Sequence, residues 1–110
     1  MKRVAWIALI LGAHLSCAAN YCIVVSQETA KHKEWAKVVS AMKEKHSAEV
    51  LYFKKSVEES LPALRKSFPR YACFIARPEE TSKDFVKAIH RMTRRLDTDP
   101  YTDLFWGILT

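Results

Sequence analysis

Polar side chains follow two short apolar segments of this chain, at the point where each segment ends. Ser26 and Gln27 follow the first segment, and Arg77, Glu79 and Glu80 follow the second. An arginine can bind a carboxylate through two parallel hydrogen bonds. These five residues are therefore candidate ligand-binding residues. The alternative interpretation is structural, with Ser26 capping a helix and Arg77 pairing with a nearby glutamate.

Phosphate, metal and cofactor chemistry find little support in the sequence. The segment 25–29 (VSQET) contains no glycine, so it forms neither a dinucleotide fingerprint nor a phosphate-binding loop. The acidic Glu28 at the predicted helix start would also repel a phosphate. His32, His46 and His90 lie too far apart in sequence for the usual spacing of metal ligands. We therefore expect no metal and no cofactor.

The two cysteines that follow residue 20 lie inside apolar segments, where cysteine usually packs as a small hydrophobic side chain. If these segments pair as neighbouring strands with Ser26 beside Ala76, Cys22 lies four residues before its strand end and Cys73 three. Because side chains alternate along a strand, this odd offset points the two thiols to opposite faces of the sheet. We therefore expect two buried free thiols rather than a disulfide, and no catalytic residue.

The elements that must position these residues alternate between strand and helix. Apolar runs predict strands, and apolar residues at helical spacing predict helices. The strands are predicted at 21–26, 49–53, 71–76 and 104–109, and the helices at 28–45, 57–68 and 82–96. This alternation predicts an α/β fold, and right-handed crossovers favour a strand order of 2-1-3-4. We expect a three-layer parallel sheet of four strands, with the first helix on one face and the other two on the opposite face.

Helical spacing also predicts which side chains point inward. The predicted inward positions are Trp35, Val38, Val39 and Met42, then Val57, Leu61, Leu64 and Phe68, and then Phe85, Ile89, Met92 and Leu96. The segment 56–59 (SVEE) is a capping box that opens the second helix. Pro62 predicts an irregular start to that helix, and Pro69 its end. Thr81 or Ser82 is predicted to cap the third helix.

The candidate site and the fourth strand occupy special places in this predicted sheet. A ligand crevice is expected at the carboxyl ends of the first and third strands, where the strand order reverses. The fourth strand is an apolar edge with one poorly covered face, which is a liability in a complete protein. We therefore expect residues 20–110 to form a domain that is incomplete at its carboxyl end, with a downstream domain of the same polypeptide as partner. Self-association through Leu104–Leu109 is the alternative.

Residues 1–19 have the three parts of a secretory signal peptide. Lys2 and Arg3 form a positive start, residues 4–13 form an apolar run, and small residues precede a cleavage site near Ala19. The apolar run is shorter than the roughly 20 residues that a membrane-spanning helix needs. We therefore expect export to the periplasm, the cell surface or the medium, with membrane contact only during export.

A lipoprotein signal is a rival interpretation of the same segment. In that case Cys17 would carry the lipid and become the first residue of the mature chain. His14 stands three residues before this cysteine, where an aliphatic residue is wanted, so the cleaved secretory signal is favoured.

The charge of the chain is mildly basic. Its formal net charge is +6, and Lys2 and Arg3 of the predicted signal contribute part of it. The basic clusters are Lys43 and Lys45, Lys54 and Lys55, and Arg91, Arg94 and Arg95. They lack interleaved aromatic residues, which indicates solvated faces, and we expect no nucleic-acid partner.

Four segments resemble the amino-terminal region of exported bacterial gingipain-like proteins, which are cysteine peptidase relatives with a caspase-like α/β fold. The segments are 21–26 (YCIVVS), 57–65 (VEESLPALR), 68–80 (FPRYACFIARPEE) and 99–110 (DPYTDLFWGILT). The resemblance covers nearly all of residues 20–110, but only the opening part of such a protein. In that family the catalytic histidine and cysteine lie further along the chain. No position here matches either motif, so the resemblance implies no catalytic residue in this chain.

The function that these observations predict is that of a non-catalytic amino-terminal α/β segment of an exported gingipain-like cysteine peptidase relative. The alternative is a complete extracytoplasmic module that binds a small ligand in the crevice or that dimerises.

Overall fold

The computed structural model of the chain describes residues 20–97 and 104–110. The predicted signal peptide at 1–19, with Cys17, lies outside the described residues. So do residues 98–103, which lie between the third predicted helix and the fourth predicted strand.

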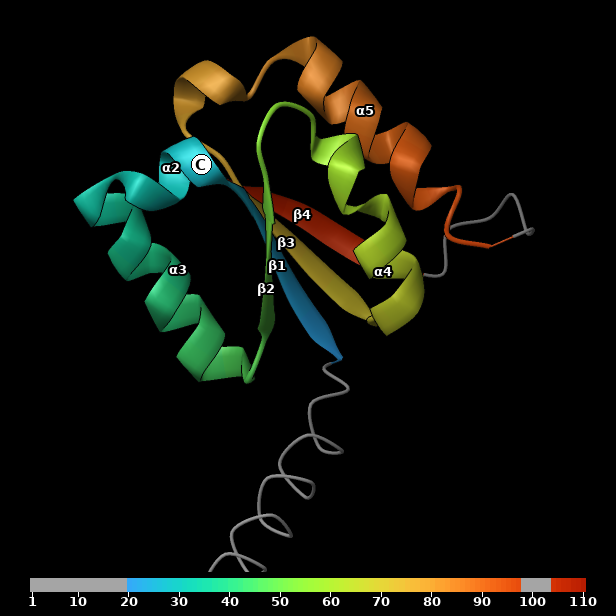
Figure 1. Cartoon of the computed structure of the whole chain (residues 1–110), viewed down its shortest axis with the longest axis horizontal. Coiled ribbons are helices and arrows are strands. Elements are labelled where there is room, and N and C mark those ends of the chain that lie inside the picture. The colour runs from blue at the N-terminus through green and yellow to red at the C-terminus, as the bar shows by residue number, and fades with distance from the viewer. Residues whose placement is uncertain (1–19, 98–103) are drawn as a thin grey trace, which may run out of the picture.

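The centre of the fold is a parallel sheet of four strands in the order β2-β1-β3-β4 (Figure 1). The strands are β1 (Tyr21–Ser26), β2 (Glu49–Phe53), β3 (Tyr71–Ile75) and β4 (Phe105–Leu109). All three strand pairs are parallel. The predicted α/β class and strand order are therefore confirmed. The physical reason for this architecture is that each apolar strand needs burial on both faces, and the crossover helices provide it.

Helices cover both faces of this sheet. They are α2 (Gln27–Lys31), α3 (Lys33–His46), α4 (Leu61–Ser67) and α5 (Lys83–Thr93), with the 3₁₀ turns η1 (Val57–Ser60) and η2 (Pro78–Glu80). Figure 1 shows α2 and α3 on one side of the sheet and α4 and α5 on the other. None of the helices within 20–97 and 104–110 is long and apolar enough to cross a membrane.

The first predicted helix is interrupted, which the sequence pattern did not indicate. His32 has an extended backbone, with φ −71° and ψ 126°, so it ends α2 and begins α3. Its backbone N–H donates to the carbonyl of Thr29 at 3.1 Å. The side chain of Thr29 is fully buried against η2, so α2 is held there while α3 turns to run along the sheet.

The second predicted helix begins with the capping box and ends earlier than predicted. The carboxylate of Glu59 accepts a hydrogen bond from the backbone N–H of Ser56 at 2.8 Å, and η1 precedes α4 as Pro62 led us to expect. The prediction that Phe68 points inward is wrong. Phe68 lies in the left-handed region at φ 42° and is 43% exposed, because Pro69 prevents another helical turn and the chain reverses.

The third predicted helix is capped by Ser82, whose Oγ accepts a hydrogen bond from the backbone N–H of Phe85 at 3.1 Å. The helix ends at Thr93 rather than near Leu96. Leu96 is nevertheless buried with Ile89 and Met92, so the predicted inward stripe packs against the sheet beyond the helix end.

Two hydrophobic clusters hold the layers together, one on each face of the sheet. The cluster beneath α4 and α5 contains Cys22, Val24, Phe53, Val57, Leu61, Leu64, Ala72, Phe74, Ile89, Met92, Leu96 and Leu104. The cluster beneath α3 contains Ile23, Val25, Val39, Ala48, Cys73 and Ile75. The register pairs Cys73 with Ile23, so the two cysteines lie on opposite faces as predicted, and both are free thiols.

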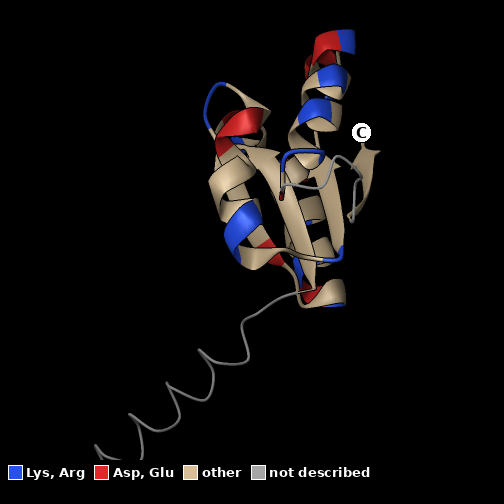
Figure 2. Cartoon of the chain, turned by 90° about the vertical axis from the view of Figure 1, so that its right-hand side faces the viewer, with Lys and Arg blue, Asp and Glu red and all other residues tan. Residues whose placement is uncertain are grey.

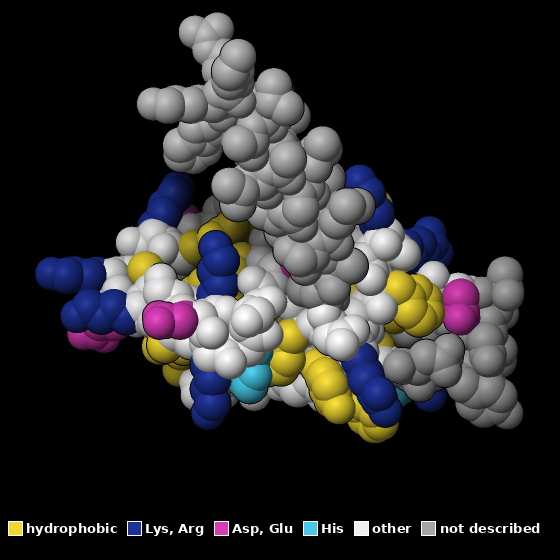
Figure 3. Space-filling view, turned by 90° about the horizontal axis from the view of Figure 1, so that it is seen from below, with side chains coloured by type: hydrophobic (Ala, Val, Ile, Leu, Met, Phe, Trp, Pro, Cys, Tyr) yellow, Lys and Arg dark blue, Asp and Glu magenta, His cyan; other side chains and the backbone are white. Residues whose placement is uncertain are grey.

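The residues that the structure describes cover only one face of the strand β4. Trp106 and Ile108 pack against the cluster beneath α4 and α5. On the α3 side Phe105 is 64% exposed and stacks on Tyr71 of β3, with ring centroids 5.9 Å apart. Figure 3 looks onto the end where the strands begin and shows hydrophobic side chains gathered there beside lysine and arginine. The poorly covered edge strand predicted from the sequence is confirmed.

Candidate functional site

Ser26 lies at the carboxyl end of β1, where the strand order reverses. Its Oγ accepts a hydrogen bond from the backbone N–H of Thr29 at 3.1 Å and so caps α2. The same hydroxyl donates to Oε2 of Glu80 at 2.7 Å. Ser26 is buried, so its bond from Thr29 is shielded from water, while its bond to Glu80 is partly buried.

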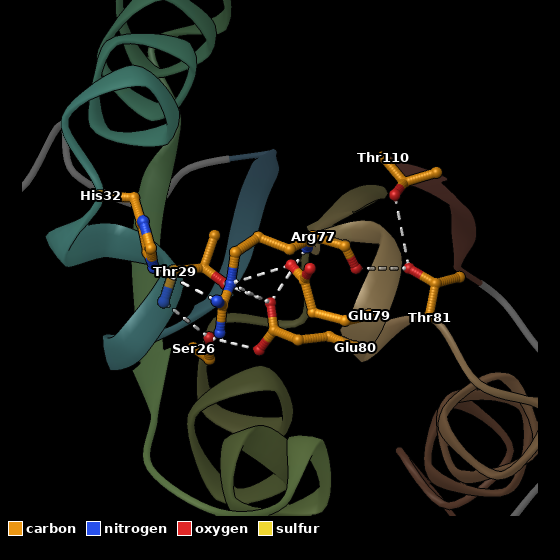
Figure 4. A network of polar contacts seen from close by, with 8 residues as sticks. All are labelled: Ser26, Thr29, His32, Arg77, Glu79, Glu80, Thr81 and Thr110. Atoms are coloured by element: carbon orange, nitrogen blue, oxygen red, sulfur yellow. Dashed lines mark hydrogen bonds and ion pairs between the residues drawn. The ribbon is translucent and has the colours of Figure 1, made fainter.

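The carboxylate of Glu80 is the centre of the polar network shown in Figure 4. Besides Ser26, the hydroxyl of Thr29 donates to Glu80, and the backbone N–H of Arg77 donates to Oε1 at 3.0 Å. Burial opposes the charge on Glu80. The hydrogen bonds from Thr29, Ser26 and Arg77, with the Arg77 charge, outweigh burial and hold the pKa of Glu80 below its ordinary value.

The guanidinium of Arg77 is engaged by the protein itself. Its Nε donates to the hydroxyl of Thr29 at 3.0 Å, and its Nη1 lies 3.2 Å from Nε2 of His32. The same Nε lies 3.6 Å from carboxylate oxygens of Glu79 and of Glu80. Thr29 therefore accepts from Arg77 and donates to Glu80, which links α2 to η2 through one buried hydroxyl.

The structure brings together four of the five residues predicted from the sequence. Ser26, Arg77 and Glu80 form the network, and Glu79 contributes a mostly exposed carboxylate that is 67% accessible. Gln27 opens α2 with its side chain exposed and does not join the network in Figure 4.

Sequence reasoning missed Thr29 and His32. Thr29 stands three residues after the capping Ser26, on the same side of the first helical turn, and that spacing was the available signal. His32 is in place only because α2 ends there, which depends on tertiary contacts. The network also reaches Thr110, the residue after β4. The hydroxyl of Thr81 donates to the carbonyl of Arg77 at 3.1 Å, and it lies 3.5 Å from the hydroxyl of Thr110.

This arrangement is better suited to holding elements together than to chemistry. A carboxylate with a lowered pKa is a weak base, and the Ser26 hydroxyl is buried behind two protein hydrogen bonds. In residues 20–97 and 104–110, every buried side-chain nitrogen or oxygen has a hydrogen-bond partner. The same residues contain no cluster of histidine, cysteine or acidic side chains that could hold a metal ion.

A groove of about 480 Å³ lies beside the network, between the segment after β2 and the first turns of α5. Of the predicted site residues only Glu80 lines it. Its lining includes Phe53 and Phe85, and the ion pair of Arg91 with Glu58 at 3.1 Å. The groove therefore combines apolar side chains with charges of both signs.

Comparison of this chain with protein-family models, with curated proteins and with solved structures found no match.

The two thiols are expected to react slowly while the protein is folded. Burial raises the pKa of Cys22 to about 11, with the Glu49 carboxylate adding to the shift and Ser67 opposing it. Burial also raises the pKa of Cys73, against a hydrogen bond from Tyr21. Because the thiolate is the reactive form, modification of Cys22 by a disulfide reagent at pH 8 should be about 100-fold slower than in denaturant, and modification of Cys73 should also be slower.

Stopped-flow absorbance of the released thiol measures both rates, and the chain in guanidinium is the control. Mass spectrometry of the folded, air-exposed protein should find both cysteines reduced. An intramolecular disulfide in the folded protein would contradict the sheet register, because it would require side chains from opposite faces to meet.

Proposed function

We propose that this chain is the non-catalytic amino-terminal α/β segment of an exported gingipain-like cysteine peptidase relative. In that role it supports a downstream domain of the same polypeptide. The support for the family is the resemblance of four segments that are distributed between residues 21 and 110. The four-stranded parallel sheet agrees with the α/β fold that the resemblance implies.

The observation that carries the non-catalytic part of the proposal is the closed polar network at the carboxyl end of the sheet. Ser26, Thr29 and Arg77 all direct hydrogen bonds to Glu80 or to one another. A catalytic or ligand-binding crevice needs polar groups that are free to meet a substrate. Here those groups join α2 to η2, so the crevice acts as a structural clamp.

The experiment has a genetic and a biochemical arm. Reading the coding sequence beyond Thr110 should reveal a strand followed by a histidine and, later, a strand followed by a cysteine. The purified protein of residues 20–110 should not hydrolyse casein, with or without the thiol reagent iodoacetamide. A stop codon directly after Thr110, or thiol-sensitive hydrolysis that disappears in Cys73→Ala, would refute the proposal.

A second candidate function, binding of a small acidic ligand by a complete extracytoplasmic module, is supported by the groove beside Glu80. Lys55 lines it and can meet a carboxylate, whereas Arg91, which also lines it, is paired with Glu58. The test is thermal unfolding with millimolar succinate. A rise in the unfolding midpoint that is lost in Lys55→Ala would favour this function, and an unchanged midpoint would remove it.

A further inference from the structure

The outer edge of β4 lacks the features that usually keep strand edges apart. Within the described residues β4 is hydrogen-bonded to β3 alone. Its five residues, FWGIL, include no charge and no proline. The opposite edge strand, β2, begins at Glu49 and is followed by Lys54 and Lys55. Figure 2 shows charged residues concentrated on helices and connections rather than on the strands. An uncharged, regular edge can pair with another strand.

The backbone of β4 shows which groups are available at this edge. The N–H of Phe105 donates to the carbonyl of Arg70 at 3.0 Å, and the carbonyl of Leu109 accepts from Ala76 at 3.1 Å. In a parallel pair, alternate residues direct both backbone groups to the same neighbour. Phe105, Gly107 and Leu109 therefore face β3, and the N–H and C=O groups of Trp106 and Ile108 face away from the sheet.

We propose that β4 pairs antiparallel with β4 of a second copy of this chain, about a twofold axis at Gly107. This register places Trp106 opposite Ile108 of the second copy, so all outward backbone groups of the two residues exchange hydrogen bonds. It also places Phe105 opposite Leu109 of the second copy. Both kinds of side-chain pair join an aromatic to an aliphatic residue, which is a favourable cross-strand combination.

The sequence of β4 fits this axis on charge and on space. Two uncharged strands bring no like charges together, and glycine faces glycine at the axis. A Cβ at Gly107 would meet nothing within 4 Å, so the α3 side of the strand is open above it. On the other side a hollow of about 330 Å³ lies between Trp106 and α5, where it is lined by Val86, Lys87, His90 and Arg91.

The exposed area sets the strength of the dimer. An aromatic side chain buries about 200 Å², so Phe105 and Tyr71 (64% and 43% exposed), with Leu109 (38%), offer about 300 Å² on each copy. A stable interface buries about 800 Å² per partner, so a weak dimer that forms only at high protein concentration is expected.

Sedimentation velocity of the purified protein over a range of concentrations tests the pairing and its register. In Phe105→Lys/Leu109→Lys, each introduced charge faces a like charge, and association should weaken by about tenfold or more. In Phe105→Glu/Leu109→Lys, opposite charges face each other in the same register, so this variant should associate about tenfold or more tightly than the double lysine variant, although both lose the apolar contact. Tyr52→Lys, at an exposed aromatic residue of the opposite edge strand, is the matched control and should not change it.

Hydrogen exchange of the unmodified protein gives a second measurement that needs no variant. The amides of Trp106 and Ile108 should exchange more slowly as the concentration rises through the dimer range, while exposed loop amides should not. The proposal is overturned by a monomer at all concentrations up to the millimolar range. It is equally overturned by two double variants that weaken association alike, or by Trp106 and Ile108 amides whose exchange ignores concentration.

Discussion

Replacing Glu80 by alanine is expected to lower the free energy of unfolding by about 3 kcal/mol, although the residue lies at the surface end of the sheet. The carboxylate accepts hydrogen bonds from the hydroxyls of Ser26 and Thr29 and from the backbone of Arg77. Its removal leaves two buried hydroxyls without their acceptor, because Ser26 and Thr29 are only 3% and 0% exposed. Denaturant unfolding followed by circular dichroism measures the loss.

The adjacent Glu79 provides a matched control for this prediction. Its carboxylate is 67% exposed and lies 3.6 Å from Nε of Arg77, so Glu79→Ala should cost less than about 0.5 kcal/mol. Equal losses in the two variants would show that Glu80 acts through general surface charge. The clamp between α2 and η2 would then be refuted.

The same carboxylate predicts how stability changes with pH. The pKa of Glu80 is lower in the folded protein than its ordinary value of 4.5, so the folded state binds fewer protons than the unfolded state. The stabilisation is therefore fully present above about pH 4.5 and is lost as the pH falls through the folded pKa. Glu80→Gln should be less stable at neutral pH and should show a flatter profile between about pH 5 and pH 3. An unchanged slope would assign the acid sensitivity to other carboxylates.

Replacing Phe74 by alanine is expected to cost about 4 kcal/mol and to lower the unfolding midpoint by about 20 °C. Phe74 lies in β3 and is completely buried beneath α4 and α5. Its ring packs edge to face against that of Trp106 in β4, with ring centroids 6.0 Å apart. The change leaves a cavity at the centre of the larger cluster and removes the ring against which Trp106 packs. Differential scanning calorimetry measures the midpoint.

Phe105→Ala is the control, since it removes the same ring from the neighbouring strand, where the side chain is 64% exposed. It should cost about 1 kcal/mol or less. If both variants lost equal stability, the uncovered face of β4 would have to be buried in the protein as it exists in solution. Measured at concentrations where the chain is monomeric, that result would contradict the exposed edge on which the pairing of two copies rests.

Much of this fold follows from the pattern of apolar residues. The strands β1 and β2 have their predicted bounds, and β3 and β4 are each one residue shorter than predicted. These segments were identifiable because parallel strands buried on both faces are nearly continuous apolar runs. The helix bounds were less accurate. The break at His32 and the reversal at Phe68 come from a tertiary contact and a helix end, which periodicity does not report.

The candidate site was predicted in part, and for a physical reason. In a parallel sheet of order 2-1-3-4 the segments after the first and third strands must meet, so Ser26, Arg77 and Glu80 were expected near one another. Their partners could not be assigned in advance. Whether Arg77 binds a ligand or hydrogen-bonds to Thr29 depends on how close α2 lies to η2, and the packing of these two elements sets that distance.

The sequence by itself determined the α/β class, the strand order and the opposite orientation of the two thiols, because these depend on local periodicity and on the handedness of crossovers. Only the tertiary structure decided that the polar side chains of the crevice form hydrogen bonds with one another. It joined a hydroxyl of α2 to a carboxylate of η2, which are 51 residues apart in sequence, and left the apolar edge of β4 open. Side chains so distant along the chain can meet only after the sheet has formed, so their hydrogen bonds are properties of the folded molecule.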